Sequence, residues 1–531
     1  MPKIHSNTIN RVLVWLNVVM ALVYFSWWLI PAHVGNPVLY GLLLFGEIYH
    51  LIMALMFWQT VRESDKISLQ QSVRKNQNIS DLSDLSDLPI SSDFSDSPIS
   101  SEPSVAIFIT VVSEPVEVVR KTVLAARDMD YKNHKVYILN DGKVAKNPNW
   151  YAMETLAKEL GIHCITREVP GGAKAGNINH ALTKTKGEIV VIFDADMIPH
   201  KDFLQKMIPH FMDKKMGFVQ SPQYYKNHAL NEITAGSWEQ QEFFFGPIMR
   251  GKDKDNAAFI CGTNVAIRRS ALMQVGGMNE DNIAEDFLTS LAIHQHGWKS
   301  VYVPEVLAEG LAPEDLLSYY KQQLRWARGS LEVLFSANPL FKKNLSWKQK
   351  LQYLSSALYY FNGVIVLIDI IMPLIFLFTG IQAVAAATTA FAIFFVPFMI
   401  LNLYTLYVAS SGRMTFRAIS FSYASFTLQL SAVISVILKQ KMGFSVTPKQ
   451  AQEGNFLFLA FPHLMYIVLT IIATGFGIYR EGFNPSVLTN VAWALLSIAL
   501  FMPFIYASYN WKKLTETLFF GKKVSRLSYG K

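Results

Sequence analysis

The stretch GEIVVIFDADMIP, residues 187–199, is an apolar run that ends in two carboxylates, Asp194 and Asp196. Such a run is typical of a buried strand in an α/β sheet, and the carboxyl end of the strand opens into a ligand crevice. Two acids one residue apart at that end suit a divalent cation, because Mg²⁺ prefers a few carboxylates and completes its shell with phosphate oxygens. By itself the triplet leaves a plain acidic turn open as the alternative.

Short apolar runs alternate with helical patterns on both sides of this stretch. The runs VAIFITVV, KVYILN, EIVVIF and SVYVP occupy residues 105–112, 135–140, 188–193 and 300–304, and helical patterns occupy 117–129 and 151–160. This alternation favours a mixed or parallel sheet covered by helices, a Rossmann-like α/β arrangement. We therefore expect one compact domain over residues 104–335.

The chain as a whole is too apolar for an ordinary soluble protein. Of its 531 residues, 51% are hydrophobic and 17% are charged. A helix crosses a bilayer with about 20 apolar residues. Runs near that length lie at residues 12–30, 38–58, 354–378, 384–409, 457–478 and 487–508. The sequence thus predicts an α-helical bundle of about six spans, two before the compact domain and four after it.

The distribution of positive charge orients these spans. The connector between the first two runs has no Lys or Arg, whereas Lys3, Arg11 and Arg62 flank their outer ends. By the positive-inside rule, both ends and the domain that follows lie in the cytoplasm. A seventh run, 419–438, would place Lys439 and Lys449 outside if it crossed, so we expect an interfacial amphipathic helix there.

These patterns divide the chain into five regions. They are a transmembrane hairpin at 1–60, a disordered Ser/Asp-rich linker at 61–103, the domain at 104–335, a membrane region at 336–511 and a basic cytoplasmic tail at 512–531. A docking or phosphorylated segment is the alternative for the linker. The net charge of +8 gathers beside the spans and at the tail, which fits anionic lipids rather than nucleic acid. Two cysteines, Cys164 and Cys261, are too few for a disulfide framework or a zinc site.

Two further motifs supply polar groups that a sheet core would not tolerate. Asn140, Asp141 and Gly142 follow KVYILN at a strand end, where side chains can hydrogen-bond a nucleotide base. In GGAKAGNIN, residues 171–179, the glycines let the backbone approach a ligand and Lys174 can neutralise phosphate. Taken alone, the first is equally a plain turn and the second a flexible loop.

Two more motifs lie further along the chain: Ala284-Glu285-Asp286 and, after it, QQLRW at residues 322–326. The ordered set resembles the D, DxD, TED and QxxRW signature of the processive family 2 glycosyltransferases, especially the bacterial cellulose synthase group. VQSPQ (219–223), FICGT (259–263) and GLAPED (310–315) extend this likeness, which covers roughly residues 105–331. The resemblance implies a glycosyltransferase A-type fold and inverting sugar transfer from a nucleotide-sugar donor.

The resemblance also implies roles for individual residues. Asp286 matches the base that takes a proton from the acceptor hydroxyl, and Asp194 and Asp196 match the holders of a divalent cation, Mg²⁺ or Mn²⁺. Trp326 and Cys261 match residues beside the acceptor sugar. The residues that match the nucleotide-sugar site are Glu114, Asn140, Asp141, Lys174, Asp194, Gln322 and Arg325.

A separate segment, FSVTPK at residues 444–449, resembles the FxVTxK gating loop of cellulose synthases. In that family the loop lies at the cytoplasmic membrane face and inserts over the donor site. The charge pattern places the segment near 419–452 in the cytoplasm as well, so the two arguments agree. The matching residues are Phe444, Val446, Thr447 and Lys449.

The sequence departs from the family pattern in four places. Asn140 replaces an aspartate, Ala284 replaces the threonine of TED, and Gly172 replaces the histidine of HAKAGN. The segment VVSE, residues 111–114, replaces TYNE and keeps only Glu114. Three of these changes lie on the nucleotide side of the site and leave the base open.

The resemblance implies a multi-pass enzyme of the plasma membrane that polymerises a linear β-glucan from UDP-glucose and threads it outward through its own helices. Within the class, the alternatives are a β-mannan, chitin or hyaluronan type synthase, or a nonprocessive enzyme that glycosylates a lipid. A transporter with a nucleotide-binding domain is the alternative outside the class, and it would not need Asp286 ahead of QxxRW. The implied partners are the donor, the growing polysaccharide and membrane lipids.

Three ionisable residues fall within the predicted spans. Glu47 and His50 lie in the second span and Asp369 lies in the third. Such residues avoid lipid and face the bundle interior or water. They either line a glycan channel or only stabilise the bundle by pairing. A channel would also use aromatic side chains such as those of Trp27, Tyr359 and Tyr360.

Overall fold

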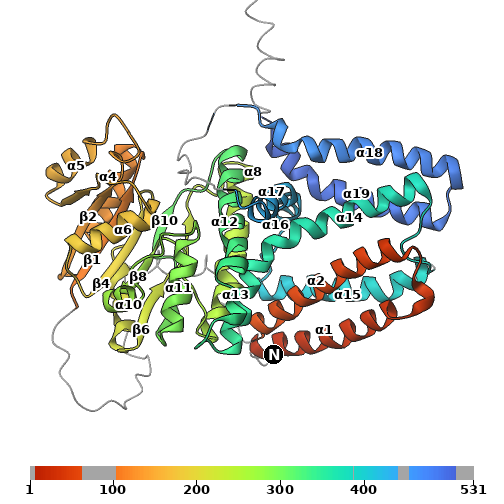
Figure 1. Ribbon diagram of the computed structural model, residues 1–531, viewed down its shortest axis with the longest axis horizontal. Helices are drawn as coiled ribbons and strands as arrows, with labels where there is room; N and C mark the ends of the chain where they lie inside the picture. Colours follow the sequence, from red (N-terminus) through yellow and green to blue (C-terminus); the bar gives the residue numbers. More distant parts are fainter. Residues whose placement is uncertain (1–5, 63–102, 387, 441–451, 453, 510–531) are drawn as a thin grey trace, which may run out of the picture.

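The computed structural model describes residues 6–62, 103–386, 388–440, 452 and 454–509. It shows an α/β domain beside a bundle of long helices (Figure 1). The predicted tail at 512–531 and nearly all of the linker at 61–103 lie outside the described residues. So do the four residues of the predicted gating loop, Phe444, Val446, Thr447 and Lys449.

The α/β domain is built on a seven-stranded mixed sheet with the order β3-β2-β1-β4-β8-β6-β9. Strands β1 to β4 are parallel, β8 is antiparallel to both of its neighbours, and β9 is parallel to β6. This confirms the predicted mixed α/β domain. The strands are β1 (Val105–Val111), β2 (His134–Asn140), β3 (His163–Thr166), β4 (Ile189–Asp194), β6 (Met216–Gln220), β8 (Val265–Arg268) and β9 (Lys299–Tyr302).

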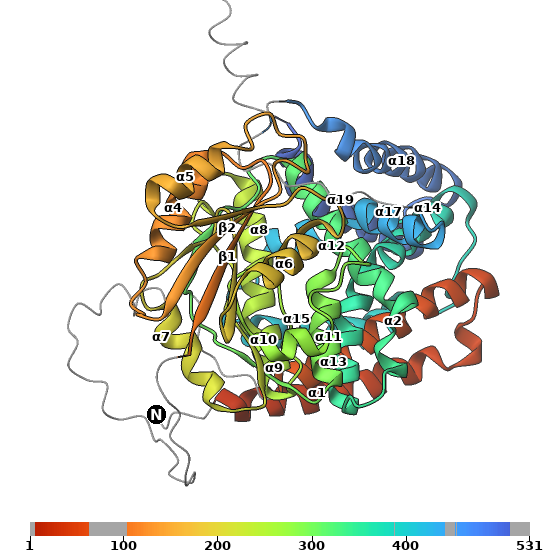
Figure 2. The same cartoon turned by 60° about the vertical axis from the view of Figure 1, so that its left-hand side comes forward.

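The unbroken apolar runs are explained by cores on both faces of the sheet. Ile107 and Ile109 of β1 pack into one core with α4 (Val116–Arg127), while Phe108 packs into the other with α6 (Ala173–Lys184). Figure 2 shows α4 and α5 (Ala152–Leu160) on one side of β1 and β2 and α6 on the other. A smaller sheet joins β5 (Ile198–Pro199), β10 (Ala308–Gly310) and β7 (Tyr224–Tyr225).

The position of the ligand crevice follows from the strand order. Since β1 pairs with β2 on one side and β4 on the other, the order reverses there, and ligands bind at the carboxyl ends of strands at such a point. Thr110 pairs in register with Asp194, and Val111 pairs with Asn140. The DxD motif and the Asn140 turn therefore share one edge of the sheet.

In the described part of the chain, six long helices form the bundle, and they run alongside one another (Figure 1). Two of the loops that connect them meet at the end far from the α/β domain. There Gly35 N donates to Ala383 O over 3.1 Å and Asn36 N donates to Gln382 O over 2.8 Å. Each helix corresponds to one predicted span. They are α1 (Ser6–Trp28), α2 (Pro37–Val61), α14 (Asn362–Thr379), α15 (Thr388–Ala409), α18 (Leu457–Glu481) and α19 (Pro485–Ala507).

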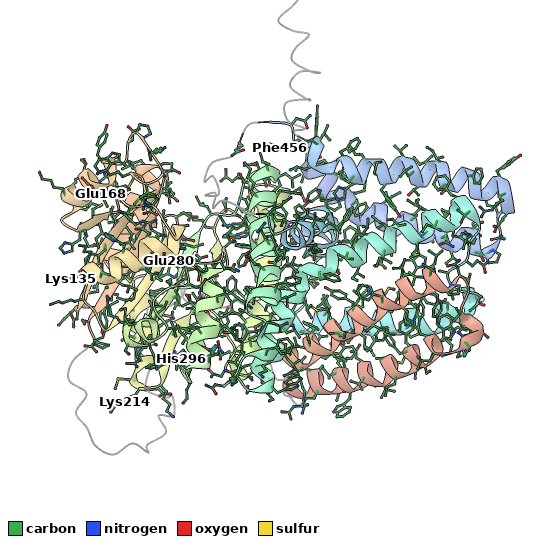
Figure 3. All side chains as sticks on the ribbon, viewed as in Figure 1. Lys135, Glu168, Lys214, Glu280, His296 and Phe456 are labelled. Carbon is green, nitrogen blue, oxygen red and sulfur yellow. The ribbon has the colours of Figure 1, made fainter. Side chains whose placement is uncertain are left out.

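The two parts of the molecule have different surfaces. Charged side chains such as those of Lys135, Glu168, Lys214 and Glu280 project from the α/β domain (Figure 3). The bundle helices instead expose large apolar side chains, including Leu22 at 68%, Ile393 at 68% and Ile471 at 67%. An apolar surface of this extent fits a lipid environment.

A seventh stretch, Phe416–Ile437, is also long and apolar enough to cross a membrane. It consists of α16 (Phe416–Ala424) and α17 (Phe426–Ile437), which are seen end-on in Figure 1, across the direction of the six bundle helices. It packs against α14 and against α12 (Leu316–Ser336). The interfacial position of this stretch stays a prediction.

The predicted third span, 354–378, falls within the candidate span Trp347–Thr379 and contains a break in the helix. A 3₁₀ turn at Tyr359–Phe361 interrupts the apolar run, so α13 (Trp347–Leu358) stands beside α12 between the sheet and the bundle, and only α14 enters the bundle (Figure 1). The remaining helices of the α/β domain are α7 (Phe203–Met207), α8 (Glu232–Phe243), α9 (Met249–Lys254), α10 (Arg269–Gln274) and α11 (Glu285–Gln295).

Ion pairs fasten the α/β domain to the crosswise helices. Arg417 of α16 contacts Glu232 over 2.8 Å and Glu239 over 2.9 Å, both on α8, and Arg413 pairs with Glu242 of the same helix. A network of part-buried charges contributes more than isolated surface pairs do. It fixes α8 and α16, which both line the cavity described next.

Candidate active site

A cavity of about 670 Å³ lies between the carboxyl edge of the sheet and the bundle. Polar and charged side chains line the part near the sheet, among them Asp141, Lys174 and Asp286. Its other walls come from α2, α15 and α16, through residues such as Met53 and Leu403. One cavity therefore connects the strand-end carboxylates to the helices of the bundle.

Asp194 and Asp196 occupy the position that the sequence predicts. Asp194 ends β4 and its backbone N–H donates to Thr263 Oγ1 over 2.9 Å. Asp196 is 2% exposed, and its Oδ2 accepts from Leu311 N over 3.1 Å. Lys174 of α6 forms an ion pair with Asp194 and donates to Gly262 O over 2.8 Å.

The chemistry of this pair fits a divalent cation that is shared with a ligand. Within the described ranges, no cluster of three or more His, Cys, Asp or Glu side chains is placed to hold a metal ion alone. Both carboxylates line the cavity, and Mg²⁺ is commonly held by one or two carboxylates with phosphate oxygens completing its shell. The residues present therefore suit a metal that arrives with a diphosphate.

An arginine that the sequence analysis missed joins two of the predicted motifs. Arg167 follows β3 and forms a bidentate pair with Asp141, with Nε–Oδ1 at 2.8 Å and Nη2–Oδ2 at 2.6 Å. Both side chains are 7% exposed. Arg167 also donates to Ala173 O over 3.1 Å and to Gly171 O. It thereby holds the Asp141 turn against the loop that carries Lys174, although a lone arginine after a short strand has no sequence pattern to reveal it.

Removing Arg167 should destabilise the protein strongly. In Arg167→Met the Asp141 carboxylate would be left buried without its partner, which typically costs about 3–5 kcal/mol. The double variant Arg167→Met/Asp141→Leu should recover much of that loss, because no buried charge then remains. Thermal unfolding of the purified protein measures both effects, and a single variant as stable as the wild type would contradict the structural role.

Two predicted donor residues have their side chains committed within the protein. Asn140 is fully buried, accepts from Gly142 N over 2.9 Å and donates to Trp150 O over 2.9 Å. Glu114 accepts from Val112 N over 2.7 Å and from Ser113 N over 3.0 Å, so its carboxylate folds its own loop. Of the two, Glu114 lines the cavity.

Asp286 lies at the amino end of α11, facing the cavity. Its Oδ1 accepts from Phe287 N over 2.7 Å. Burial raises the pKa of both Asp286 and its neighbour Glu285. Gly262 separates Asp286 from Lys174, since a Cβ added there would lie 3.2 Å from Asp286 Oδ2 and 3.6 Å from Lys174 Nζ. A raised pKa suits a carboxylate that must accept a proton near neutral pH.

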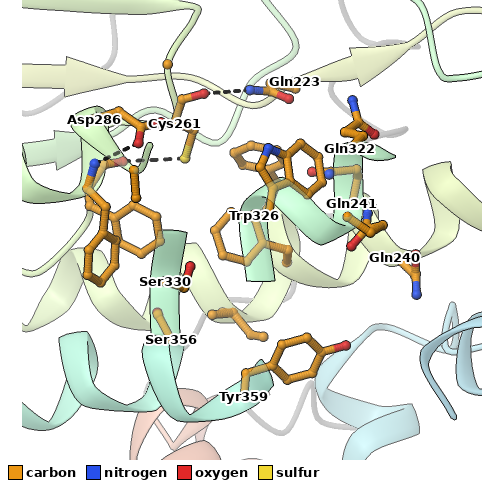
Figure 4. A pocket seen from close by; sticks show the side chains of 18 of the residues that line it. Gln223, Gln240, Gln241, Cys261, Asp286, Gln322, Trp326, Ser330, Ser356 and Tyr359 are labelled. Atoms are coloured by element: carbon orange, nitrogen blue, oxygen red, sulfur yellow. Dashed lines mark hydrogen bonds between the residues drawn. The ribbon is translucent and has the colours of Figure 1, made fainter. Parts of the chain in front are cut away.

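Trp326 of α12 stands in the middle of the cavity wall, with Asp286 and Cys261 on one side of it (Figure 4). Cys261 N donates to Gln220 Oε1 over 2.9 Å, and Cys261 O accepts from Gln223 Nε2 over 2.7 Å. Burial, with the charge of Asp286, raises the pKa of the Cys261 thiol, so it is a poor nucleophile. Gln322 and Arg325, the other residues of the motif, also line the cavity.

The structure gives physical reasons for two of the departures from the family pattern. Gly172 has a φ of +61°, which favours glycine, and a Cβ there would lie 2.4 Å from Glu280 Oε2 and displace that side chain. Ala284 packs against α12, where a Cβ on Gly329 would lie 2.9 Å from the Ala284 Cβ. A larger residue at position 284 would alter this close approach of the two helices.

The polar and aromatic residues predicted for a channel are only partly together. Tyr359 and Tyr360 line the cavity. Trp27 does not, because it is 2% exposed and packs against Trp28 and Phe391 at the outer end of the bundle. Glu47 and Asp369 lie on the facing helices α2 and α14, where a Cβ on Gly46 would be 4.0 Å from Asp369 Oδ1. His50 is exposed.

Comparisons with known proteins agree with this geometry. Residues 103–329 match the family model described as glycosyltransferase like family 2, and residues 273–472 match the one described as cellulose synthase. The chain is 30% identical over 92% of its length to the UDP-forming cellulose synthase catalytic subunit of Komagataeibacter sucrofermentans. It is 35% identical over 71% of its length to cellulose synthase 2 of Novacetimonas hansenii. It spans 65% and 24% of the lengths of these two relatives.

Among solved structures, the chain aligns with a mannosyltransferase from Pyrobaculum calidifontis in complex with GDP-Man and Mn²⁺. That alignment has a TM-score of 0.44 and 17% identity, and it covers 75% of this chain and 99% of the other.

Proposed function

We propose that the chain is a processive inverting hexosyltransferase, because residues 103–329 match the family model described as glycosyltransferase like family 2 and residues 273–472 match the one described as cellulose synthase. The proposed product is a linear β-glucan built from a nucleotide sugar, with UDP-glucose as the leading donor. The observation that carries the proposal is the single cavity shared by Asp194, Asp286 and Trp326, which continues to the bundle helices.

The proposed reaction assigns one task to each group of residues. Asp286 takes the proton from the acceptor hydroxyl as that oxygen attacks the anomeric carbon, whose bond to the diphosphate breaks in the same displacement. Lys174 and Arg325 stabilise the charge that gathers on the leaving diphosphate. A divalent cation, Mg²⁺ or Mn²⁺, held by Asp194 and Asp196, would add to that neutralisation. Trp326 offers an aromatic face to the acceptor sugar.

The same proposal includes the route of the product and the place of the enzyme. The cavity extends from the reacting groups to Tyr359, Leu403 and Ser422 at the bundle. We place the protein in the plasma membrane with the α/β domain in the cytoplasm, where nucleotide sugars are made. The polymer then leaves through the helices as it grows. Glu47 and Asp369 are candidates for a polar lining along that route.

Purified protein should release nucleoside diphosphate from one nucleotide sugar in a reaction that depends on a divalent cation. The experiment compares UDP-glucose, UDP-N-acetylglucosamine and GDP-mannose with Mg²⁺, with Mn²⁺ and with EDTA, followed by linkage analysis of the polymer. We expect turnover with UDP-glucose and a β-linked glucan. If no donor released nucleoside diphosphate, the proposal that the protein is a glycosyltransferase would be wrong. If only another donor did, the product would be a different polysaccharide.

A further inference from the structure

Four glutamine side chains lie around Trp326: Figure 4 shows Gln240, Gln241 and Gln322 on the side away from Asp286 and Cys261, and Gln223 above the indole, hydrogen-bonded to Cys261. They come from separate elements of the fold, since Gln240 and Gln241 lie on α8, Gln322 lies on α12 and Gln223 follows β6. All four line the cavity. Each amide offers both donors and an acceptor, which is the pattern that sugar hydroxyls require.

Three of these amides already have partners within the protein. Gln223 Nε2 donates to Cys261 O over 2.7 Å, and Gln240 Oε1 accepts from the Tyr319 hydroxyl over 2.9 Å. Gln322 hydrogen-bonds the Tyr225 hydroxyl. These bonds hold three of the four glutamine side chains in place, and Gln241 is the fourth.

Gln241 differs from the others. It is 9% exposed, and the part of the chain that the structure describes provides no hydrogen-bond partner for its amide. The amide lines the cavity, so a ligand there can hydrogen-bond it in place of water. Gln241 lies between Trp326 and Gln240 (Figure 4), so the ligand within its reach is one that stacks on the indole ring.

From this arrangement we propose that Gln241 is a specificity-determining residue, which hydrogen-bonds hydroxyls of the neutral sugar unit that stacks on Trp326. The inference rests on the proposed function and extends it to the class of acceptor. The four glutamine amides are uncharged. They can hydrogen-bond sugar hydroxyls, but they provide no positive charge to offset the carboxylate of a uronic acid. Among the described residues, three cations line the cavity, and each has another role: Lys174 pairs with Asp194, Lys252 donates to Ser355 Oγ over 3.2 Å, and Arg325 is assigned above to the leaving diphosphate.

Binding of oligosaccharides to purified wild-type protein and to Gln241→Leu, measured by calorimetry, tests this inference. Cellohexaose is the neutral probe, and a hyaluronan hexasaccharide is the uronate-containing probe. We expect Gln241→Leu to bind cellohexaose about 10- to 100-fold more weakly, because one or two neutral hydrogen bonds to sugar hydroxyls are lost. The wild type should prefer cellohexaose. Gln205→Leu, which changes an exposed glutamine on α7, is the matched control and should bind as the wild type does.

The outcomes separate this inference from the proposed function. Equal cellohexaose affinity in the wild type and Gln241→Leu, or tighter binding of the hyaluronan probe by the wild type, would overturn the inference even if the enzyme turns over. Cellohexaose binding that depends on Gln241, in a protein that releases no nucleoside diphosphate, would support the inference while removing the reaction. Gln241→Met provides a second apolar variant, and an unchanged KM for the donor in both variants excludes a general loss of structure.

Discussion

Replacing Asp286 by Asn should lower kcat by about 10²–10⁴-fold, the usual contribution of a positioned general base. The substitution keeps the shape of the side chain and an oxygen that can accept from Phe287 N, which now donates over 2.7 Å. It removes the negative charge that makes the carboxylate basic enough to take the acceptor proton. Donor binding should change little, because Lys174, Arg325 and the DxD pair are untouched. Release of nucleoside diphosphate measures the rate, and calorimetry with the donor measures binding.

The pH dependence of the wild type provides a second test of the same assignment. The base acts when deprotonated, and burial raises the pKa of Asp286, so activity should fall as the pH drops through that raised value. The acid limb should therefore lie above about 3.9, the ordinary pKa of an aspartate. Polymer synthesis retained by Asp286→Asn, or an acid limb at the ordinary value, would contradict the role of Asp286 as base.

The core of the fold could be predicted because its strands are buried on both faces. Runs such as VAIFITVV and EIVVIF became β1 and β4, and their cores explain why they contain no polar interruption. Strands β3, β6 and β8, of four or five residues, were not predicted, whereas the equally short β9 was, because SVYVP combines β-branched and aromatic residues with a closing proline. The break at Tyr359–Phe361 was missed because three aromatic residues in a row carry no glycine or proline to mark a helix end.

The candidate site was predictable where a motif repeats a known order of residues, and less so where tertiary packing decides. Asp194, Asp286 and Trp326 come together in one cavity as the motifs imply. Arg167 and Gln241 had no such pattern, and only the assembled fold brings them to Asp141 and to Trp326. Asn140 is the opposite case. The motif predicts it for the nucleotide-sugar site, but its side chain hydrogen-bonds the backbone of its own turn and Trp150 O.

Replacing Asp196 by Asn should abolish most of the effect of divalent cations on donor binding and lower kcat/KM by about 10²-fold or more. Asp196 is 2% exposed and lines the cavity beside Asp194, so its carboxylate is placed to complete a shared site with diphosphate oxygens. An amide keeps one neutral oxygen and loses the charge that a hard cation requires. Titration of the donor in Mn²⁺ and in EDTA measures the metal dependence directly.

The result separates a metal site from a structural turn, because Leu311 N, which donates to Asp196 Oδ2 over 3.1 Å, could still donate to the amide oxygen of the variant. Asp130→Asn, which changes an exposed aspartate away from the cavity, is the matched control and should retain the full response to Mn²⁺. If Asp196→Asn bound the donor with an unchanged dependence on Mn²⁺, the DxD pair would not hold the cation. The leaving diphosphate would then depend on Lys174 and Arg325 for its neutralisation.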